Sequence, residues 1–407
     1  MKILVSAYAC EPNKGSEPGI GWNWVRQTAR FHEVWVITRA NNRNIIIEEL
    51  NKNPIANLYF HYLDLPRWTC FWKKGSRGLH LYYYLWQIAS YFAAKKLNKK
   101  IKFDLAHHVT FASDWMPSFL SFLPIPFIWG PLGSHAPLPK VFLKYFGIRP
   151  FCREISRLFF KKLFRSFDPF TRHTMNKSKK IIIIDTKQIR RIPKRLQAKT
   201  MTFSNIGINL NELPKNSLSK YKDFPIILSA ARLVYFKGFR LSIESFALFL
   251  KIFPNYKLII VGDGPEKAIL EMIARKRNII NEIVMTGRLP RTEVLKYIIS
   301  CDIFLYPSFA AGDLVVPEVL AAGKPIICLD FGGPGEMVTN ECGIKIKAKS
   351  PRQVINDLAK ALELLASDEQ LRKNLGEGAR RRAEEVFNWD IKGEQINRIY
   401  QKIINGL

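Results

Sequence analysis

The sequence is poor in acidic residues and in cysteine, and it contains no long uninterrupted apolar run. Only 34 Asp and Glu residues stand against 63 Lys and Arg residues, a formal net charge of +29. The six cysteines are scattered, without a C-x-x-C pair or nearby histidine spacing, so we predict neither a disulfide framework nor a metal site, and a reducing cytosol fits best. The apolar stretch 118–133 is broken by three prolines, and the run 79–94 falls short of the roughly 20 residues of a membrane-spanning helix. We therefore expect a protein that does not cross a membrane.

The chain has ample material for folded cores. Its 407 residues are too many for one compact core and suit two domains of ordinary size. Apolar residues make up 47% of the chain and aromatic residues 13%, which excludes disordered, collagen-like and low-complexity proteins. We expect two folded lobes.

The positive charge is concentrated in one part of the chain. Residues 138–200 contain 18 Lys and Arg residues and only 3 Asp and Glu residues. Such an excess indicates partners that carry phosphate groups or an anionic membrane surface. Charge alone does not choose between them.

Short apolar runs alternate with helix-length segments, which is typical of parallel sheets with helices on both faces. The fold class predicted is α/β, with two doubly wound, Rossmann-like domains. The first apolar run is short and lacks a small-residue cleavage site, so we interpret it as a buried strand and not as a signal peptide. The predicted strands are Ile3–Ala7, Val34–Thr38, Leu58–Tyr62, Leu105–Val109, Phe127–Trp129, Lys180–Ile184, Ile226–Ala230, Lys257–Val261, Ile283–Thr286, Ile303–Tyr306 and Ile326–Leu329.

The domain boundaries follow from composition. The polar stretch 206–223 is the best candidate for a linker between the two domains. We therefore predict a first domain over 1–205, a second over 224–389 and a last helix over 390–407.

Cations and glycines follow the predicted strands of the second half, at the sheet edge where α/β proteins bind ligands. Arg232 and Lys237 lead into a helix, an arrangement that suits a diphosphate; a solvated surface pair is the alternative. Gly262 and Gly264 permit a tight turn, and a simple turn that starts a helix also explains them. Arg288 lies where a planar group can approach the backbone, or in an ordinary loop.

The segment 306–325 resembles a family signature. Retaining glycosyltransferases of family 4, which have the two-lobed GT-B fold, carry here an acid, a Gly-rich stretch, a second acid and then E-A-x-A-x-G-x-P. Glu318 matches the second acid, and Gly323 and Pro325 match the ending. The first acid falls on Ala310, and Asp313, three residues later, substitutes for it only if the loop is shifted. Because of this departure, the sequence does not identify the donor sugar.

The resemblance covers most of the chain, strongly over 225–340. Further matches are Arg232 with Lys237-Gly238 to R-x-x-x-x-K-G, Gly262–Pro265 to G-x-G-P, Asn205–Asn209 to the interdomain segment, Phe387–Trp389 to the F-x-W before the last helix, the loop Gly15–Gly19, and the strand end His107-His108.

The resemblance implies a division of roles. The first domain would bind the acceptor, the second the nucleotide-sugar donor, and the last helix would pack back on the first. Arg232 and Lys237 would stabilise the leaving diphosphate, without a metal or other cofactor. His107 or His108 would take part in catalysis together with Glu318, which would also bind the ribose. Gly15, Ser16 and Glu17 would form an acceptor or phosphate loop. The remaining donor contacts would come from Gly262, Gly264, Arg288, Asp313, Leu314 and Val315. A hydrogen-bonded structural role is the alternative for either histidine, and a helix-surface carboxylate is the alternative for Glu318.

Residues 151–165 form a basic and aromatic segment that can be helical. Arg153, Arg157, Lys161 and Arg165 recur at every fourth position, joined by Lys162, beside a broad apolar arc. This pattern is typical of helices that lie on an anionic membrane surface, and we expect a membrane-facing segment over about 138–180. An amphipathic core helix with a solvated basic face is the alternative. Nucleic acid is not an expected partner, because no recognised binding module is present.

Together these patterns predict a glycosyltransferase on the cytoplasmic face of the cell membrane. It would move a sugar from a nucleotide sugar to a lipid-linked or saccharide acceptor in polysaccharide or lipopolysaccharide synthesis. The alternatives are a catalytically impaired binding protein of the same fold, and a GT-B phosphorylase or epimerase.

Overall fold

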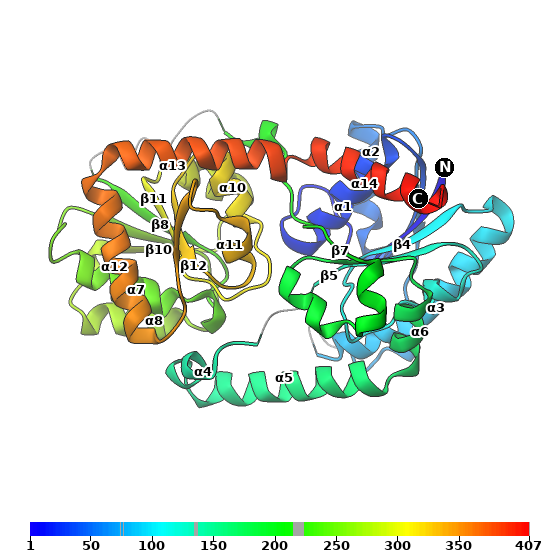
Figure 1. Cartoon of the computed structure of the whole chain (residues 1–407), viewed down its shortest axis with the longest axis horizontal. Helices are drawn as coiled ribbons and strands as arrows, with labels where there is room; N and C mark the ends of the chain where they lie inside the picture. Colours follow the sequence, from blue (N-terminus) through cyan, green and yellow to red (C-terminus); the bar gives the residue numbers. More distant parts are fainter. Residues whose placement is uncertain (74, 76, 134–136, 215–223, 407) are drawn as a thin grey trace. The chain divides into compact units, whose positions relative to one another are not determined.

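The computed structural model describes residues 1–406 except 74, 76, 134–136 and 215–223, and its chain divides into two compact units (Figure 1). The first unit comprises Met1–Ser134, Arg157–Asn205 and Trp389–Leu407. The second comprises His135–Ser156 and Ile206–Asn388.

The first unit is built on a parallel sheet. Within the described residues it has seven strands, in the order β3-β2-β1-β4-β5-β6-β7, so the strand order reverses between β1 and β4. The strands are β1 (Lys2–Ala7), β2 (Glu33–Thr38), β3 (Leu58–Tyr62), β4 (Leu105–Thr110), β5 (Phe127–Leu132), β6 (Lys180–Ile183) and β7 (Thr200–Thr202).

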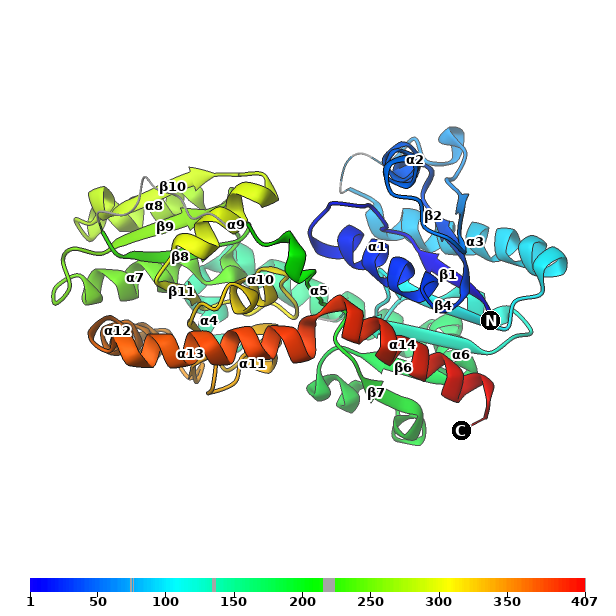
Figure 2. The same cartoon turned by 90° about the horizontal axis from the view of Figure 1, so that it is seen from above.

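Alternate residues of these strands form a core on each face of the sheet. On one face, Trp86 of α3 packs with strand residues such as Leu4 and Trp129. On the other, Trp24 of α1 and Tyr400 of α14 pack with Val5, and α1 and α14 lie side by side (Figure 2). The helices of this unit are α1 (Ser16–Ala29), α2 (Arg43–Lys52), α3 (Leu79–Ile101), α6 (Pro169–Lys177) and α14 (Trp389–Ile404); α5 (Ile148–Phe167) belongs to both units.

The second unit repeats this plan. Its described strands form a six-stranded parallel sheet in the order β10-β9-β8-β11-β12-β13, with the reversal between β8 and β11. The strands are β8 (Ile226–Ala230), β9 (Lys257–Val261), β10 (Ile283–Gly287), β11 (Ile303–Tyr306), β12 (Ile326–Leu329) and β13 (Gly343–Ile346).

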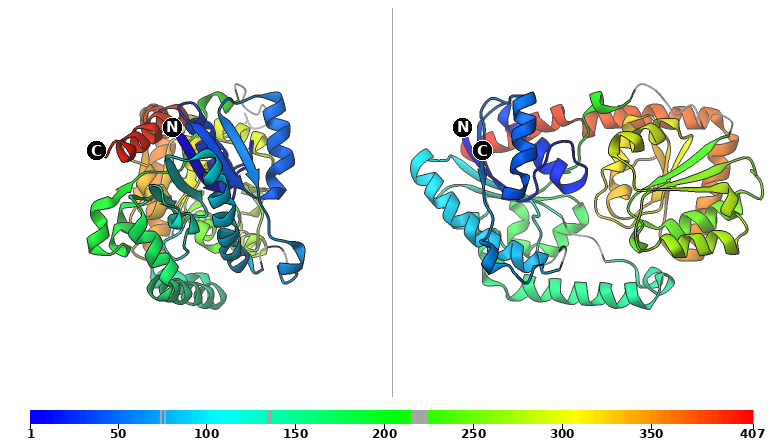
Figure 3. Two further views of the ribbon diagram at one scale, coloured as in Figure 1. Left: turned by 90° about the vertical axis from the view of Figure 1, so that its right-hand side faces the viewer. Right: turned by 180° about the vertical axis from the view of Figure 1, so that it is seen from behind.

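Helices surround this second sheet (Figure 3). Apolar side chains of α4, α7, α8 and α12 share one core with the strands. The helices of this unit are α4 (Lys140–Phe146), α7 (Phe239–Phe249), α8 (Lys267–Lys276), α9 (Arg291–Ser300), α10 (Val315–Ala321), α11 (Gly332–Met337), α12 (Pro351–Ser367) and α13 (Glu369–Arg382).

The predicted α/β fold with two Rossmann-like domains is confirmed, and every predicted strand is present. The analysis missed β7 and β13, which are three and four residues long. Both are short and carry polar side chains or glycine, so neither forms the continuous apolar run that identifies a buried parallel strand.

One segment lies outside the predicted first domain. Residues 135–156 belong to the second unit, although the prediction extended the first domain from 1 to 205. The cause is aromatic packing: the Phe142 ring lies 4.8 Å from that of Phe309, and Arg240 donates to the Phe146 carbonyl at 3.1 Å. Of the predicted linker 206–223, residues 206–214 belong to the second unit and 215–223 lie outside the described residues.

The helix α14 anchors the chain end in the first unit through a buried lysine. Lys392 is 2% exposed, and its Nζ donates to the Ser204 carbonyl at 2.9 Å and lies 4.8 Å from the Phe203 ring centre. Burial lowers the pKa of Lys392 to about 7, because the charged form loses its hydration.

Replacing Lys392 by Met should change how stability depends on pH. Between pH 7 and the ordinary lysine pKa of about 10.4 the unfolded chain holds this proton and the folded chain does not, so the wild type gains stability as pH rises. Lys392→Met should remove this rise, whereas Lys402→Met, at an exposed site on the same helix, should keep it. Urea unfolding at pH 7, 8 and 9 measures the difference; parallel curves for wild type and Lys392→Met would contradict the expectation.

Candidate functional site

Two loops meet at the carboxyl edge of the second sheet, where their backbones touch. The Leu233 amide, after β8, donates to the Asp263 carbonyl, after β9, at 2.9 Å. A Cβ on Gly262 would lie 1.9 Å from the Ala231 oxygen, and one on Gly264 would lie 2.4 Å from the Leu233 oxygen. The predicted glycines are therefore needed for contact between loops within the protein.

A buried cation lies at this edge. Lys237, which is 8% exposed, forms an ion pair with Asp313 and donates to the Tyr306 hydroxyl at 3.1 Å. The Ser308 hydroxyl donates to the same carboxylate at 3.3 Å. Asp313, the residue expected to replace the missing first acid, thus neutralises Lys237. Ala310 is buried and presents no polar side chain.

The other predicted donor residues lie at the ends of neighbouring elements. Arg232 and Arg288 are exposed, and among the described residues the Arg232 side chain has no hydrogen-bond or ion-pair partner. Leu314 precedes α10 and Val315 is its first residue, so the expected helix start is in place.

Glu318 is held by an arginine that the sequence analysis missed. Its carboxylate, on a residue 8% exposed, accepts from Arg291 Nε at 2.7 Å, and Arg291 also pairs with Glu212 at 2.5 Å. Burial raises the pKa of Glu318, and Arg291 opposes that rise. Arg291 begins α9 beyond a proline, with no spacing relation to Glu318, so only the folded chain brings the two together.

The structure does not support the predicted catalytic role of His107. It is fully buried, its Nδ1 lies 2.6 Å from the Tyr400 hydroxyl, and its Nε2 lies 2.6 Å from the Gly130 carbonyl. Burial lowers the pKa of His107 to about 3, so the ring is neutral at physiological pH. Both ring nitrogens lie within hydrogen-bond distance of groups inside the first unit.

His108 is also enclosed. It is 1% exposed, and its Nε2 lies 2.8 Å from the Tyr83 hydroxyl and 3.0 Å from the Thr110 carbonyl. Burial lowers the pKa of His108 to about 4. The hydrogen-bonded structural role therefore fits both histidines.

Of the predicted loop, Gly15 caps α1, and Ser16 and Glu17 are the first residues of that helix. Gly15 and Ser16 are exposed, and Ser16 has a left-handed backbone with φ of 62°. Glu17 accepts from the Phe111 amide at 2.7 Å, and Phe111 itself has φ of 59°. Glu17 thus ties this loop to the end of β4.

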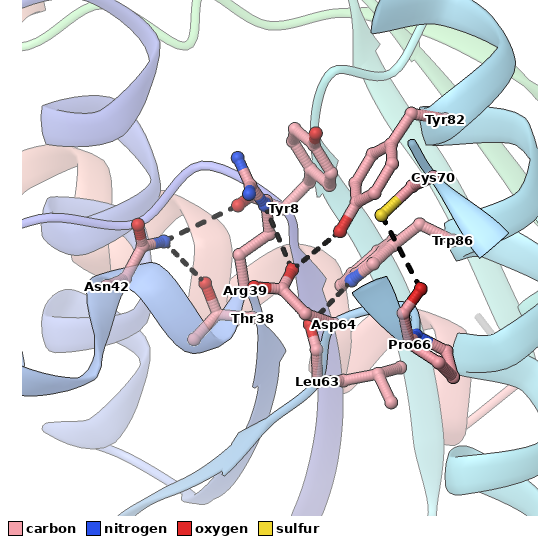
Figure 4. Close-up of polar contacts among 10 residues, drawn as sticks. All are labelled: Tyr8, Thr38, Arg39, Asn42, Leu63, Asp64, Pro66, Cys70, Tyr82 and Trp86. Atoms are coloured by element: carbon pink, nitrogen blue, oxygen red, sulfur yellow. Dashed lines mark hydrogen bonds and ion pairs between the residues drawn. The ribbon is translucent and has the colours of Figure 1, made fainter. Parts of the chain in front are cut away.

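A second group that the sequence analysis missed lies at the carboxyl edge of the first sheet (Figure 4). Arg39, after β2, pairs with Asp64, after β3, at 3.1 Å between Nε and Oδ1. Its guanidinium carbon lies 5.3 Å from the ring centres of both Tyr8 and Tyr82. The Tyr82 hydroxyl donates to Asp64 at 2.9 Å.

The basic helix α5 is turned differently from the prediction. Arg165 pairs with the buried Asp114 at 2.5 Å, Lys161 lies 5.9 Å from the Trp115 ring centre, and Arg157 Nε is buried. These three cations therefore face the protein, whereas Arg153 and Lys162 are exposed as expected. The apolar residues are the outward ones: Ile148, Ile155, Phe159, Phe160, Leu163, Phe164 and Phe167 are all exposed.

The described residues contain neither a membrane-spanning helix nor a cluster of metal ligands. None of its helices combines the length and the apolar character that crossing a bilayer requires. No group of three or more His, Cys, Asp or Glu residues is arranged to hold a metal ion among the same residues.

Part of the second unit matches a known family model. Residues 211–382 match the model described as Glycosyl transferases group 1. These residues form a glycosyl transferases group 1 domain.

Curated relatives match over part of their length. A GDP-mannose-dependent monoacylated alpha-(1-6)-phosphatidylinositol monomannoside mannosyltransferase of Corynebacterium glutamicum is 27% identical over 44% of this chain and 47% of its own length. An N,N'-diacetylbacillosaminyl-diphospho-undecaprenol alpha-1,3-N-acetylgalactosaminyltransferase of Campylobacter jejuni is 29% identical over 51% of this chain and 56% of its own. The chain thus spans about half the length of the curated relatives it matches.

Solved structures resemble the whole chain in fold. The Anabaena protein HepE in complex with UDP and glucose has a TM-score of 0.64 at 16% identity, covering 98% of this chain and 99% of that one. This likeness shows the GT-B fold, as the sequence predicted.

Gly262→Ala should destabilise the second unit. The new Cβ would collide with the Ala231 oxygen, and the backbone has φ of 143°, so we expect a loss of about 2–3 kcal/mol in the free energy of unfolding. The matched control is Gly15→Ala, with φ of −80° and open space around the new Cβ, which should change stability by less than about 0.5 kcal/mol. Denaturant titration compares them; equal effects would show that the loop contact is unimportant.

Proposed function

We propose that this chain, whose residues 211–382 form a glycosyl transferases group 1 domain, is a glycosyltransferase that uses a nucleotide-diphosphate sugar. The acceptor is a lipid-linked or saccharide molecule in cell-surface polysaccharide synthesis. The observation that carries the proposal is the buried Lys237, at the carboxyl edge of the second sheet, whose only ion-pair partner among the described residues is Asp313. Two findings support it: the Campylobacter relative is named for a diphospho-undecaprenol acceptor, and HepE was solved with UDP and glucose.

The chemistry needs positive charge at the leaving group. The bond between the anomeric carbon and the diphosphate oxygen breaks, and its electron pair stays with the diphosphate. The acceptor hydroxyl oxygen forms the new bond, and its proton passes to the departing diphosphate. Lys237 and the exposed Arg232 supply the charge that stabilises this dianionic group, without a metal ion in the proposal. With both histidines enclosed, the proposal assigns them no proton transfer.

The proposed reaction retains the anomeric configuration, as the resemblance to family 4 implies. Glu318 has a place in it as the ribose ligand. Its carboxylate is oriented by Arg291 Nε at 2.7 Å, and a ribose would have to share or displace that contact. Ala310 has no acid to offer a sugar hydroxyl, and in the proposal Asp313 takes that role by turning from Lys237 to the sugar as the diphosphate takes its place.

Substitutions at the Lys237–Asp313 pair should move nucleotide affinity in opposite directions. Lys237→Ala should weaken UDP or GDP binding at least tenfold, about 1.4 kcal/mol, because a cation is lost. Asp313→Asn should strengthen it, because the carboxylate no longer competes with phosphate for Lys237. Lys296→Ala, at a lysine paired with Glu293 on the surface of α9, is the control and should have no effect. Calorimetric titration measures all three; unchanged affinity in Lys237→Ala would refute the assignment.

We further propose that the enzyme works as a peripheral protein on the cytoplasmic face of the cell membrane, with α5 as its docking element. Large apolar side chains on α5 are solvent-exposed, Phe159 at 62% and Phe167 at 73%. The only acid within 138–167, Glu154, is buried, so the exposed charges there are cationic. Lipid tails match the apolar face and anionic headgroups match the surrounding cations, which are Lys140, Lys144, Arg149, Arg153 and Lys162.

Polar substitution on α5 should release the protein from vesicles. Phe159→Ser with Phe160→Ser should greatly reduce sedimentation with vesicles of phosphatidylcholine and phosphatidylglycerol, whereas the control Phe92→Ser, at a phenylalanine 63% exposed on α3, should not. Wild-type binding should fall with added salt and on pure phosphatidylcholine, and an oligonucleotide should not compete. Full binding of the double variant would place the docking surface elsewhere.

A further inference from the structure

The group in Figure 4 has properties that packing alone does not require. Tyr8 and Arg39 directly follow β1 and β2, and Asp64 is the second residue after β3. The three strands are neighbours in the sheet, so these side chains converge at its carboxyl edge. Ligands of open α/β sheets bind at this edge. The side chain of Arg39 remains 23% exposed, so its guanidinium is both fixed and accessible.

Among the described residues, the Arg39 guanidinium is paired with one carboxylate. Arg39 Nε bonds Asp64, but neither terminal nitrogen has a carboxylate or carbonyl acceptor among the described residues. A guanidinium with two parallel free donors matches the two oxygens of a phosphate or carboxylate. The flat faces of Tyr8 and Tyr82 hold the group between them.

The surrounding contacts make this arrangement rigid. Tyr8 is 3% exposed, and its ring packs edge-on against those of Tyr83 and Trp86 at 4.9 and 5.0 Å. Trp86 Nε1 donates to the Leu63 carbonyl at 2.8 Å, which fixes the residue before Asp64. A binding site built on rigid strand ends loses little entropy when its ligand binds.

The local charge is positive. Lys73 Nζ lies 5.0 Å from the Tyr82 ring centre, and the Arg43 guanidinium lies 5.7 Å from that of Tyr62. Asp64 is the one acid that pairs with any of these cations among the described residues. These cations suit a ligand that carries an anionic group.

We propose that Arg39, held between Tyr8 and Tyr82, binds an anionic group of the acceptor, a phosphate or a carboxylate next to a sugar. That the ligand is the acceptor rests on the proposed function, whereas the anion site itself does not. The two sources of the anion are the diphosphate of a lipid-linked saccharide and the carboxylate of an acidic sugar.

The test separates this site from the donor site. In a Lys237→Ala background, which removes the buried cation of the second unit, farnesyl diphosphate and glucuronate are titrated against the full-length chain by calorimetry. Arg39→Ala should weaken the better-bound probe at least tenfold, and Arg39→Lys several-fold, because an ammonium keeps the charge and loses the paired donors. Arg26→Ala, on α1, is the matched control and should leave binding unchanged.

The outcomes are distinct. Preference for farnesyl diphosphate identifies a lipid-linked diphosphate, and preference for glucuronate identifies an acidic saccharide. The proposal is overturned if the Arg39→Lys variant binds the probe as tightly as its parent and has the same melting temperature. It is also overturned if neither probe binds. UDP and GDP affinity in an otherwise native Arg39→Ala variant should be unchanged. Failure of nucleotide binding in the wild type would instead contradict the proposed function and leave the anion site standing.

Discussion

The second unit depends on one buried ion pair, between Lys237 and Asp313. The Lys237 side chain is 9% exposed. Burying its charge is costly unless an opposite charge and hydrogen bonds compensate for the lost hydration. Asp313 and the Tyr306 hydroxyl provide this compensation. Gly238 is part of the same arrangement: a Cβ there would lie 2.0 Å from the Pro307 oxygen, so only glycine lets the Lys237 loop lie against the end of β11.

Under the proposed function, the same lysine would contribute to the stability of the free chain and to diphosphate binding. A free chain needs a counter-charge for Lys237, and the carboxylate supplies it. A diphosphate carries the same sign of charge with more acceptor oxygens, so it can replace the carboxylate without leaving the cation unpaired. The exposed Arg232 lies on the same loop and pays no comparable desolvation cost. Under the proposed function, the affinity for a diphosphate would be the difference between these two ways of neutralising Lys237.

The sequence predicted the strands and the positions that follow them, because apolar runs and strand-end glycines are local features. It did not predict partners that are distant along the chain. His107 lies on β4, a central strand, and is closed in by Tyr400 from the last helix. The amphipathic pattern of α5 was visible in the sequence. Its orientation, however, depends on the ion pair between Arg165 of α5 and Asp114, which lies in the segment after β4. The Arg39–Asp64 and Arg291–Glu318 pairs likewise exist only in the folded chain.

The central claim is that Lys237 binds the diphosphate of a nucleotide sugar. The most direct measurement is a crystal structure of the full-length chain with UDP or GDP bound. We expect a phosphate oxygen within hydrogen-bond distance of Lys237 Nζ, with the Asp313 carboxylate moved away from it. A nucleotide whose phosphates lie elsewhere, with the Lys237–Asp313 pair intact, would contradict the account.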